Sequence, residues 1–373
     1  MAVNTIGVLL PRSKDYPSLG FDLLHGVRSQ LSQSGIIPRF VSENIGFGEN
    51  PALIYARAEK MIIENDVDII IGYIDATNAA PLGQLALATQ RPFLLVDAGM
   101  RLPLQTPGPY VYHITLQGAH ACRIAGEMAG GNGKKVLMAT SFYDGGYDGP
   151  SAYYEGLDSA GGSVCGNYIS GPKESEFNIK HYMSLLEFSG AQSIAACFST
   201  YLATLFLQSL KKENGKATPL PFYCAPFMAE EQLLGNIDHP GGEFHAVVPW
   251  ASDIDNPAQH EFLQRMKDTG KRANVFHLLG WEAGCLVKIL SEDRAIALEG
   301  YCYDSPRGLT TIHPDTHHTY TQLYKARIVA GDDQKCRLVT DGSINITADE
   351  HSRILGRKID GILSGWKNNY LCI

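Results

Sequence analysis

The sequence predicts an α/β fold built from two doubly wound parallel-sheet lobes. Short apolar runs alternate with segments of helical periodicity, and this alternation occurs twice along the 373 residues. No long Gly/Ser-rich linker separates the halves, so the passages near residues 116–119 and 250–254 are expected to be short hinge strands. Two lobes joined in this way can close on each other like jaws.

The first half carries apolar runs with helical patterns between them. Leu23, Val27 and Leu31 recur every four residues and mark one helix face, and Asn50-Pro51 is typical of a helix start. Because strands that alternate with helices pair in parallel, this half predicts a sheet with helices on both faces. The predicted strands are residues 6–10, 37–41, 67–72 and 92–97, and another apolar run follows at 110–115.

A second α/β unit of similar size follows. It opens with a helix at 119–128 that ends at Gly130-Gly131, and it shares a pattern with the first unit but no sequence repeat. The predicted strands are residues 136–140, 164–169, 194–198, 221–225 and 245–250, and the predicted helices are 150–159, 178–188 and 201–212.

The chain beyond residue 250 predicts a return to the first lobe. It offers a helix at 257–268, an apolar helix at 276–290 and a β-rich tail, with no new set of strands directly after the helices. We therefore expect the lobes to be divided as residues 1–118 with 251–298 and residues 119–250 with 299–345, while 346–373 form a C-terminal segment of unassigned lobe.

Composition excludes several functional classes. Hydrophobic residues make up 45% of the chain and charged residues 19%, which is typical of a soluble globular protein. A net charge of −8, with no basic stripe, argues against a nucleic-acid partner. No apolar run is long enough to cross a membrane.

The N-terminus leaves the compartment open. Residues 1–4 lead almost directly into the first apolar run, so we expect either a cytoplasmic protein or a mature sequence with a start codon added. None of the eight cysteines forms a CxxC pair. Cys197 and Cys224 are expected in the core, and Cys302 and Cys336 could pair if the protein is exported.

The turn after the third predicted strand is the strongest candidate for a binding site. The apolar run 66–72 ends at a glycine, and Asp75, Ala76 and Thr77 follow where a helix begins. Open parallel sheets bind ligands at the carboxyl ends of their strands, where backbone N–H groups of a helix start are free. The turn lacks phosphate-loop glycines, so we expect a small polar solute rather than a nucleotide.

Several segments resemble a known family. The stretches IGVLLPRS at 6–13, VDIIIG at 67–72 and PFLLVDA at 92–98, with Gly20 and Gly26 between the first two, are similar to the type I periplasmic binding proteins. These are the solute receptors of ABC transporters for branched-chain amino acids, amides and urea. The resemblance covers nearly the whole chain in element order. It implies three hinge segments and one small molecule bound between the lobes.

A later segment resembles one branch of this family in particular. SPRGLTTIHPDTHH at 305–318, before the strand-like run 324–329, resembles the amide- and urea-binding branch. The family's contact loops then imply a set of ligand-binding residues: Arg12, Ser13, Tyr16, Tyr73, Asp75, Ala76, Thr77, Asp97, Ala98, Gly99, Tyr143, Tyr147, Ser199, Thr200, Tyr201, Pro226 and Phe227.

Two of these residues depart from the amino-acid-binding pattern. Asp75 and Asp97 stand near positions where the resemblance leads us to expect small hydroxyl residues, so a plain leucine-like ligand is disfavoured. Two carboxylates suit an amine, an amide or urea, which offer several donors. Thr77 is the main hydroxyl of this turn.

Structural roles compete with binding at most of these positions. Asp75, Thr77 and the run 199–201 are also suited to capping the helices that follow them. Asp97 could pair with Arg12 or Arg101.

The aromatic and acidic candidates also have structural readings. Tyr143 and Tyr147 flank a glycine-rich turn, where they could close over a ligand or be merely partly buried. Trp250 is expected to pack at the hinge, and Glu282 to face solvent or the hinge.

Three functions follow in order of preference. The first is an extracytoplasmic solute-binding protein that works with an ABC permease as a monomer or weak dimer and uses no cofactor. The second is a cytoplasmic amide-type sensor with the same fold. The third, a nucleotide-dependent enzyme, lacks GxGxxG after the first strand, where PRSKDY stands at 11–16. No metal site is expected, because His313, His317 and His318 have neither helical spacing nor acidic partners nearby.

Overall fold

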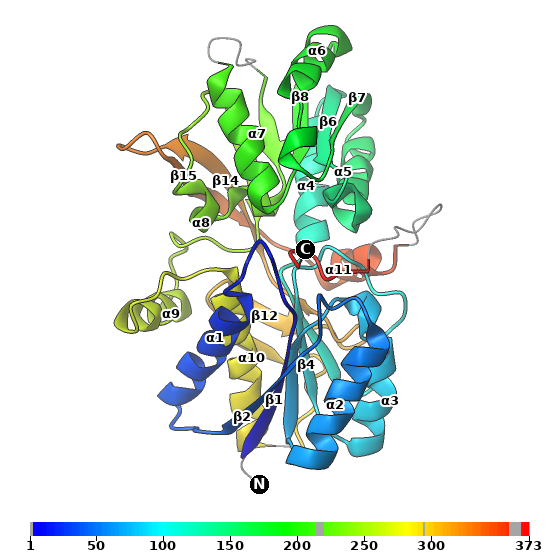
Figure 1. Cartoon of the computed structure of the whole chain (residues 1–373), viewed down its shortest axis with the longest axis vertical. Coiled ribbons are helices and arrows are strands. Elements are labelled where there is room, and N and C mark those ends of the chain that lie inside the picture. The colour runs from blue at the N-terminus through cyan, green and yellow to red at the C-terminus, as the bar shows by residue number, and fades with distance from the viewer. Residues whose placement is uncertain (1–2, 214–219, 294, 358–366, 373) are drawn as a thin grey trace.

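The computed structural model describes residues 3–213, 220–293, 295–357 and 367–372, which form two α/β lobes stacked along the long axis of the molecule (Figure 1). The first lobe holds a five-stranded sheet of order β2-β1-β3-β4-β5, and every pair in it is parallel. Its elements are β1 (Thr5–Leu10), α1 (Leu19–Gln33), β2 (Arg39–Asn44), α2 (Pro51–Asn65), β3 (Ile69–Tyr73), η1 (Ala76–Asn78), α3 (Ala80–Thr89), β4 (Phe93–Asp97) and β5 (Val111–Thr115).

The second lobe holds a seven-stranded sheet of order β15-β14-β10-β9-β8-β6-β7. Its first five strands in the chain pair in parallel, and β14 and β15 add antiparallel strands at one edge. The elements are α4 (Gly118–Gly130), β6 (Lys135–Ser141), η2 (Asp144–Gly146), α5 (Asp148–Ser159), β7 (Ser163–Ser170), η3 (Glu174–Glu176), α6 (Ile179–Ser189), β8 (Ser193–Cys197), α7 (Thr200–Lys212), β9 (Phe222–Cys224), η4 (Pro226–Ala229), α8 (Glu231–Leu234), β10 (Phe244–Val248), β14 (Leu323–Ala330) and β15 (Cys336–Ile344).

The remaining elements connect or cover the lobes. They are α9 (Pro257–Asp268), α10 (Val275–Glu292), β11 (Cys302–Ser305), β12 (Gly308–Ile312), β13 (Thr319–Tyr320) and α11 (Ala348–Leu355). The predicted fold class, two lobes with mainly parallel sheets, is therefore confirmed. No helix in the described ranges combines the length and apolar character that a membrane span requires.

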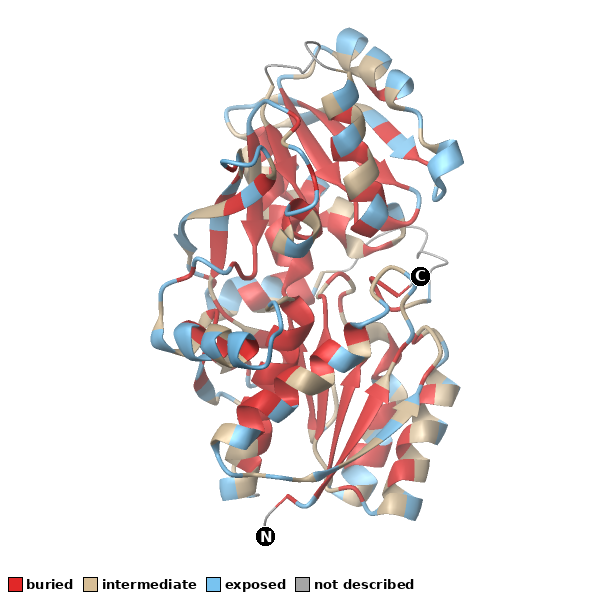
Figure 2. Cartoon of the chain, turned by 60° about the vertical axis from the view of Figure 1, so that its left-hand side comes forward, coloured by how far each residue is buried: buried red, intermediate tan, exposed pale blue. Residues whose placement is uncertain are grey.

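Burial explains why the strands of both sheets are so apolar. Both faces of a sheet in a doubly wound lobe are covered by helices, so successive side chains are buried on opposite sides. In β3, Ile69 and Ile71 belong to the core shared with α1, whereas Ile70 belongs to the core shared with α2 and α3. Figure 2 shows the resulting buried sheets between half-exposed helices.

The chain returns to the first lobe through α10, which packs on α1 at very short range. A Cβ atom added to Gly26 would lie 2.1 Å from the carbonyl oxygen of His277, and one added to Gly280 would lie 2.0 Å from that of Leu23. Glycine is therefore required at both positions for the two backbones to approach this closely.

The β-rich tail divides between the lobes, which differs from the predicted assignment of residues 299–345 to the second lobe. β11, β12 and β13 form a separate small sheet beside β5, where the backbone N–H of His113 donates to the carbonyl of His317 over 2.9 Å. Only β14 and β15 extend the second sheet. The tail therefore reaches the second lobe after Tyr320, and this third passage completes the hinge.

The predicted start of β2 was wrong, and the possible pairing of Cys302 with Cys336 is not found. β2 begins at Arg39 rather than Ile37, whose side chain is 91% exposed, because β2 is an edge strand that pairs with β1 alone and needs no fully apolar run. All eight cysteines are free, and Cys302 and Cys336 lie in different sheets. Cys197 and Cys224 are fully buried, as predicted.

Candidate functional site

The carboxyl ends of the two parallel sheets face each other, and the chain's own residues 367–372 lie between them. We call residues 367–372 the inserted segment, and Figure 1 shows the C-terminal end of the ribbon at this junction of the lobes. Asn369, Tyr370, Leu371 and Cys372 are all buried. The predicted segment 346–373 is otherwise represented by α11 and the residues up to 357, and its residues 358–366 and 373 lie outside the described residues.

Asn369 holds the inserted segment to the turn after β3. Its Nδ2 donates to the carbonyl oxygen of Tyr73 over 2.7 Å, and its Oδ1 accepts from the backbone N–H of Asp75 over 2.8 Å. Both backbone groups are left unpaired by the end of the strand, which is why such turns bind polar ligands. The turn after β3 therefore binds a side-chain amide in this structure.

Two hydroxyl groups and one side-chain amide of the first lobe bind the backbone of the inserted segment. The Tyr73 hydroxyl donates to the carbonyl oxygen of Tyr370 over 3.1 Å, and the Ser13 hydroxyl donates to that of Leu371 over 2.5 Å. Asn78, in η1, donates to the carbonyl of Lys367 over 3.2 Å.

The second lobe surrounds the ring of Tyr370. Tyr143, Tyr147 and Phe227, which we call the aromatic cage, have ring centroids 6.0, 4.7 and 5.2 Å from that of Tyr370. The Tyr143 ring is nearly parallel to it, at 7°, and the other two meet it edge-on, at 71° and 64°. These are the favourable geometries for aromatic pairs.

A carboxylate lies at the far end of the caged ring. The Tyr370 hydroxyl donates to Oδ1 of Asp144 over 2.7 Å. The other oxygen, Oδ2, accepts from the Ser141 hydroxyl and from the backbone N–H of Ser199, over 3.1 Å in the latter case. Burial raises the pKa of Asp144, and hydrogen bonds from Ser141, Tyr370 and Ser199 oppose that rise.

Asp75 provides a second buried carboxyl group on the first lobe. Burial raises its pKa well above the usual range, and the nearby charge of Asp97 adds to the rise, while Arg101 and a backbone hydrogen bond from Tyr370 oppose it. Its Oδ2 has no hydrogen-bond partner among the described residues. The side chain makes no capping bond to η1, so the alternative of pure capping was wrong for Asp75. A protonated Asp75 can donate as well as accept a hydrogen bond.

Direct contacts between the lobes close the site. The Tyr16 hydroxyl donates to Oε2 of Glu230 over 2.8 Å, and the Thr200 hydroxyl donates to Asp15. Burial raises the pKa of Glu230 to about 7, and the hydrogen bond from Tyr16 limits that rise. Pro226, beside the cage residue Phe227, is also buried at this junction.

Several predicted residues lie away from the inserted segment. Arg12 is exposed, and the Tyr201 side chain turns outward, its hydroxyl donating to the carbonyl of Pro172. Ala76 and Thr77 line a different cavity of about 120 Å³ beside α3, together with His113.

The loop after β4 contacts the start of α4 and the ring of His113. Asp97 accepts a hydrogen bond from the N–H of Gly99 over 2.8 Å and lies 3.6 Å from Nδ1 of His113, in place of the alternative pairing with Arg12 or Arg101. The carbonyls of Ala98 and Gly99 accept the first N–H groups of α4.

Some residues of the site were not predicted. The sequence did not predict Asp144, Asn369, Tyr370 or Glu230, although the DGG turn between Tyr143 and Tyr147 is a usable signal for Asp144. Asn369 and Tyr370 carried no such signal, because a distant segment is brought to the site only by the tertiary fold.

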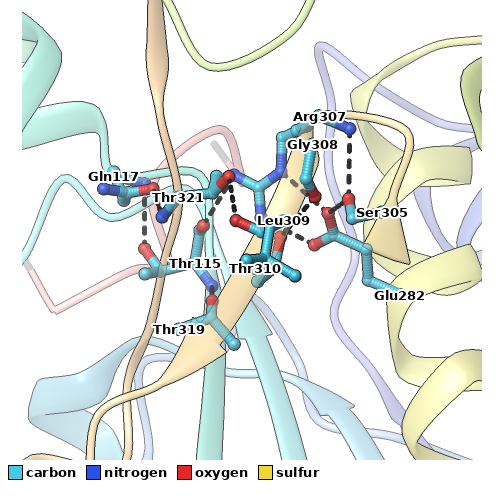
Figure 3. Close-up of polar contacts among 10 residues, drawn as sticks. All are labelled: Thr115, Gln117, Glu282, Ser305, Arg307, Gly308, Leu309, Thr310, Thr319 and Thr321. Atoms are coloured by element: carbon cyan, nitrogen blue, oxygen red, sulfur yellow. Dashed lines mark hydrogen bonds and ion pairs between the residues drawn. The ribbon is translucent and has the colours of Figure 1, made fainter. Parts of the chain in front are cut away.

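A buried ion pair organises the hinge beside the site (Figure 3). The Arg307 guanidinium donates to both carboxylate oxygens of Glu282 over 2.8 and 2.7 Å, and both side chains are fully buried. Arg307 also donates to the carbonyl of Thr115 over 3.1 Å, and Gln117 accepts from the N–H of Thr321 over 3.0 Å. Glu282 therefore faces the hinge, which is one of the two predicted alternatives, and not solvent.

The Trp250 side chain packs near a second hinge passage. Its indole N–H donates to Gln259 over 2.9 Å, and its ring meets Phe262 edge-on. The packing role predicted for Trp250 fits these contacts. Within the described ranges no cluster of His, Cys, Asp or Glu could hold a metal ion.

Comparisons with known proteins agree with this architecture. The family model described as periplasmic binding protein matches residues 5–334. The Leu/Ile/Val-binding protein homolog 6 of Brucella suis biovar 1 (strain 1330) is 22% identical over 354 residues, which is 89% of each chain.

Solved structures show the same fold. A solute-binding protein of an ABC transporter from R. palustris, in complex with 4-hydroxybenzoate, superposes with a TM-score of 0.73 at 20% identity and covers 92% of this chain and 97% of its own. An ABC transporter substrate-binding protein from Sphaerobacter thermophilus reaches 0.77 at 18% identity, covering 92% and 98%. The chain belongs to the periplasmic binding protein family.

Proposed function

We propose that the site between the lobes captures one small solute outside the cytoplasm and that the closed form is then recognised by an ABC permease. The observation that supports the proposal most directly is the convergence of both sheets on one buried polar site. The turn after β3 offers a carbonyl and an N–H at Tyr73 and Asp75, and the second lobe offers the carboxylate of Asp144. A solute that contacts both lobes stabilises the closed form over the open one.

Similar proteins and the carboxyl groups of the site each suggest ligand classes to test. The relative named Leu/Ile/Val-binding protein homolog 6 suggests aliphatic amino acids, and the solved structures of similar fold include complexes with 4-hydroxybenzoate and benzoate. The two carboxyl groups, Asp75 and Asp144, favour a solute with hydrogen-bond donors, such as an amide, urea or a phenol.

A thermal-shift screen tests the proposal. The panel contains leucine, short amides, urea, benzoate and 4-hydroxybenzoate. A solute at about 100 times its Kd stabilises the folded protein by about 2.7 kcal/mol, which raises the melting temperature measurably. Calorimetric titration should then give one molecule per chain. Failure of every class to bind, at millimolar concentration, would contradict a solute-binding role for this site.

The cytoplasmic sensor remains a second candidate, because the fold and the site would be the same. Cell fractionation with an antibody to the chain distinguishes the two. Recovery from the periplasm or the outer face of the membrane supports the transporter role, whereas recovery from the cytoplasm together with a co-purifying regulatory partner supports the sensor.

A further inference from the structure

We propose that the inserted segment, residues 367–372, is a built-in ligand of the interlobe site, displaced by an external solute that carries a phenol-like ring. The proposal rests on the proposed function, since it adds a competitor and a ligand class to the same site. Its foundation is geometric: the segment lies where both sheets end and contacts both lobes at once.

The inserted segment is recognised through its backbone by hydroxyl groups of both lobes. Carbonyl oxygens of Asn368, Tyr370 and Leu371 accept from the hydroxyls of Tyr147, Tyr73 and Ser13. The first of these donors belongs to the second lobe, and the other two belong to the first. A segment held from both sides stabilises the closed form in the same way that a bound solute does.

The amide of Asn369 makes the contacts expected of a polar ligand group. It pairs with the carbonyl of Tyr73 and the N–H of Asp75, the two backbone groups at the strand end where open sheets bind solutes. The fit is close, because a Cβ added to Gly48 would lie 2.3 Å from the Asn369 amide nitrogen. Glycine at position 48 therefore lets the backbone of the first lobe lie directly against this amide.

Tyr370 identifies the chemistry of the displacing solute. Three aromatic side chains surround its ring, and Oδ1 of Asp144 accepts the phenolic hydroxyl. The other oxygen of Asp144 is already held by Ser141 and Ser199. A ring without a donor at this end would leave Oδ1 buried and unpaired, and a site built for a hydroxyl rejects such an analogue.

Tethering makes the inserted segment an effective competitor. Because it belongs to the same chain, its concentration at the site is set by the connection and not by the solution. Only molecules whose site is empty can bind an external solute. The apparent Kd of that solute therefore equals its intrinsic Kd divided by the fraction of molecules with an empty site. Weakening the segment should therefore tighten binding of the solute without any new contact.

The first experiment measures release of the segment through Cys372, whose thiol is buried. A Cys302→Ser background removes the exposed cysteine, and maleimide labelling of Cys372 is followed by peptide mass spectrometry. Tyr370→Ala should raise the labelling rate about tenfold or more, because the caged ring and its hydrogen bond are lost. Tyr154→Ala, which removes an exposed tyrosine, is the matched control and should label at the wild-type rate.

The second experiment titrates 4-hydroxybenzoate and benzoate into the wild-type chain, Tyr370→Ala and Tyr154→Ala by calorimetry. We expect 4-hydroxybenzoate to bind Tyr370→Ala about tenfold or more tightly than it binds the wild type. Benzoate should bind that variant about tenfold or more weakly than 4-hydroxybenzoate does, since it offers no hydroxyl to Asp144. The same phenol should accelerate Cys372 labelling in the wild-type chain.

The possible failures are distinguishable. Equal labelling of Cys372 in the wild type and in Tyr370→Ala overturns the built-in ligand, whichever solutes bind. Equal affinity of Tyr370→Ala for the two benzoates overturns the phenol class. A raised labelling rate in Tyr370→Ala, with no solute of the thermal-shift panel binding that variant, overturns both the proposed function and the phenol class. Asn369→Ala repeats the labelling test with a different contact removed.

Discussion

The guanidinium of Arg307 lies 2.7 Å from the carboxylate of Glu282, and both side chains are shielded from solvent. The pair joins α10 of the first lobe to the turn between β11 and β12, and Arg307 extends the contact to the end of β5 (Figure 3). The ion pair thus ties α10 and the turn between β11 and β12 to the end of β5, where the first passage between the lobes begins.

Breaking this ion pair should destabilise the protein strongly. Arg307→Met leaves the Glu282 carboxylate buried without its partner, which costs about 3–5 kcal/mol in the free energy of unfolding. Urea denaturation measures the change. Arg327→Met is the control, because its ion pair with Asp341 is solvent-exposed and should contribute far less to stability than the buried pair. Similar losses in the two variants would contradict this account of the hinge.

The close contact between α1 and α10 predicts a second large effect. Gly26→Ala places a methyl group against the carbonyl of His277, so the helices must separate, and we expect a loss of about 2–4 kcal/mol. Gly83→Ala in α3 is the matched control. Its added carbon meets only ordinary contacts at 3.6 Å, and alanine favours the helix by up to about 1 kcal/mol. A thermal melt of both variants checks the prediction, which fails if Gly26→Ala melts with the wild type.

The raised pKa of Glu230 predicts a pH dependence. A carboxyl group whose pKa is about 7 in the folded state and 4.5 when free binds more protons folded than unfolded. Its contribution is therefore fully present below pH 4.5 and is lost as pH rises towards 7, by up to about 3 kcal/mol.

The measurement compares unfolding free energies at several pH values from 4.5 to 8. Glu230→Gln, which stays neutral, should flatten the decline with rising pH, whereas Glu64→Gln, at an exposed site on α2, should leave it unchanged. An undiminished decline in Glu230→Gln would exclude this residue as its source.

The two buried carboxyl groups should respond differently to the same substitution. Asp144 accepts from Ser141, Ser199 and Tyr370, so the NH₂ group of Asp144→Asn would meet a donor, and we expect a loss of about 1–3 kcal/mol.

The raised pKa of Asp75 favours its neutral form, and its Oδ2 lacks a partner among the described residues. Asp75→Asn should therefore lower the free energy of unfolding by less than about 1 kcal/mol. Chemical denaturation at pH 7 compares the two. The reverse order would show that Asp75 is ionised in the folded protein.

The sequence by itself was sufficient for the architecture. Apolar runs such as 67–72 and 92–97 alternate with helical faces, and a parallel sheet covered on both sides is the arrangement that buries both. The same local pattern indicated the turn at Asp75, whereas Tyr143 and Tyr147 were implied by the family resemblance. Each of these signals lies within a few residues of the element that it describes.

The tertiary structure decided what those signals could not. Tyr370 lies 226 residues from Asp144 in the chain, and no local pattern connects them, yet they share a buried hydrogen bond. In the loop after β4, the carbonyls of Ala98 and Gly99 accept the first N–H groups of α4, a helix start that lies about twenty residues further along the chain. Periodicity records which face of an element is buried, whereas the partner that buries it depends on packing between distant segments.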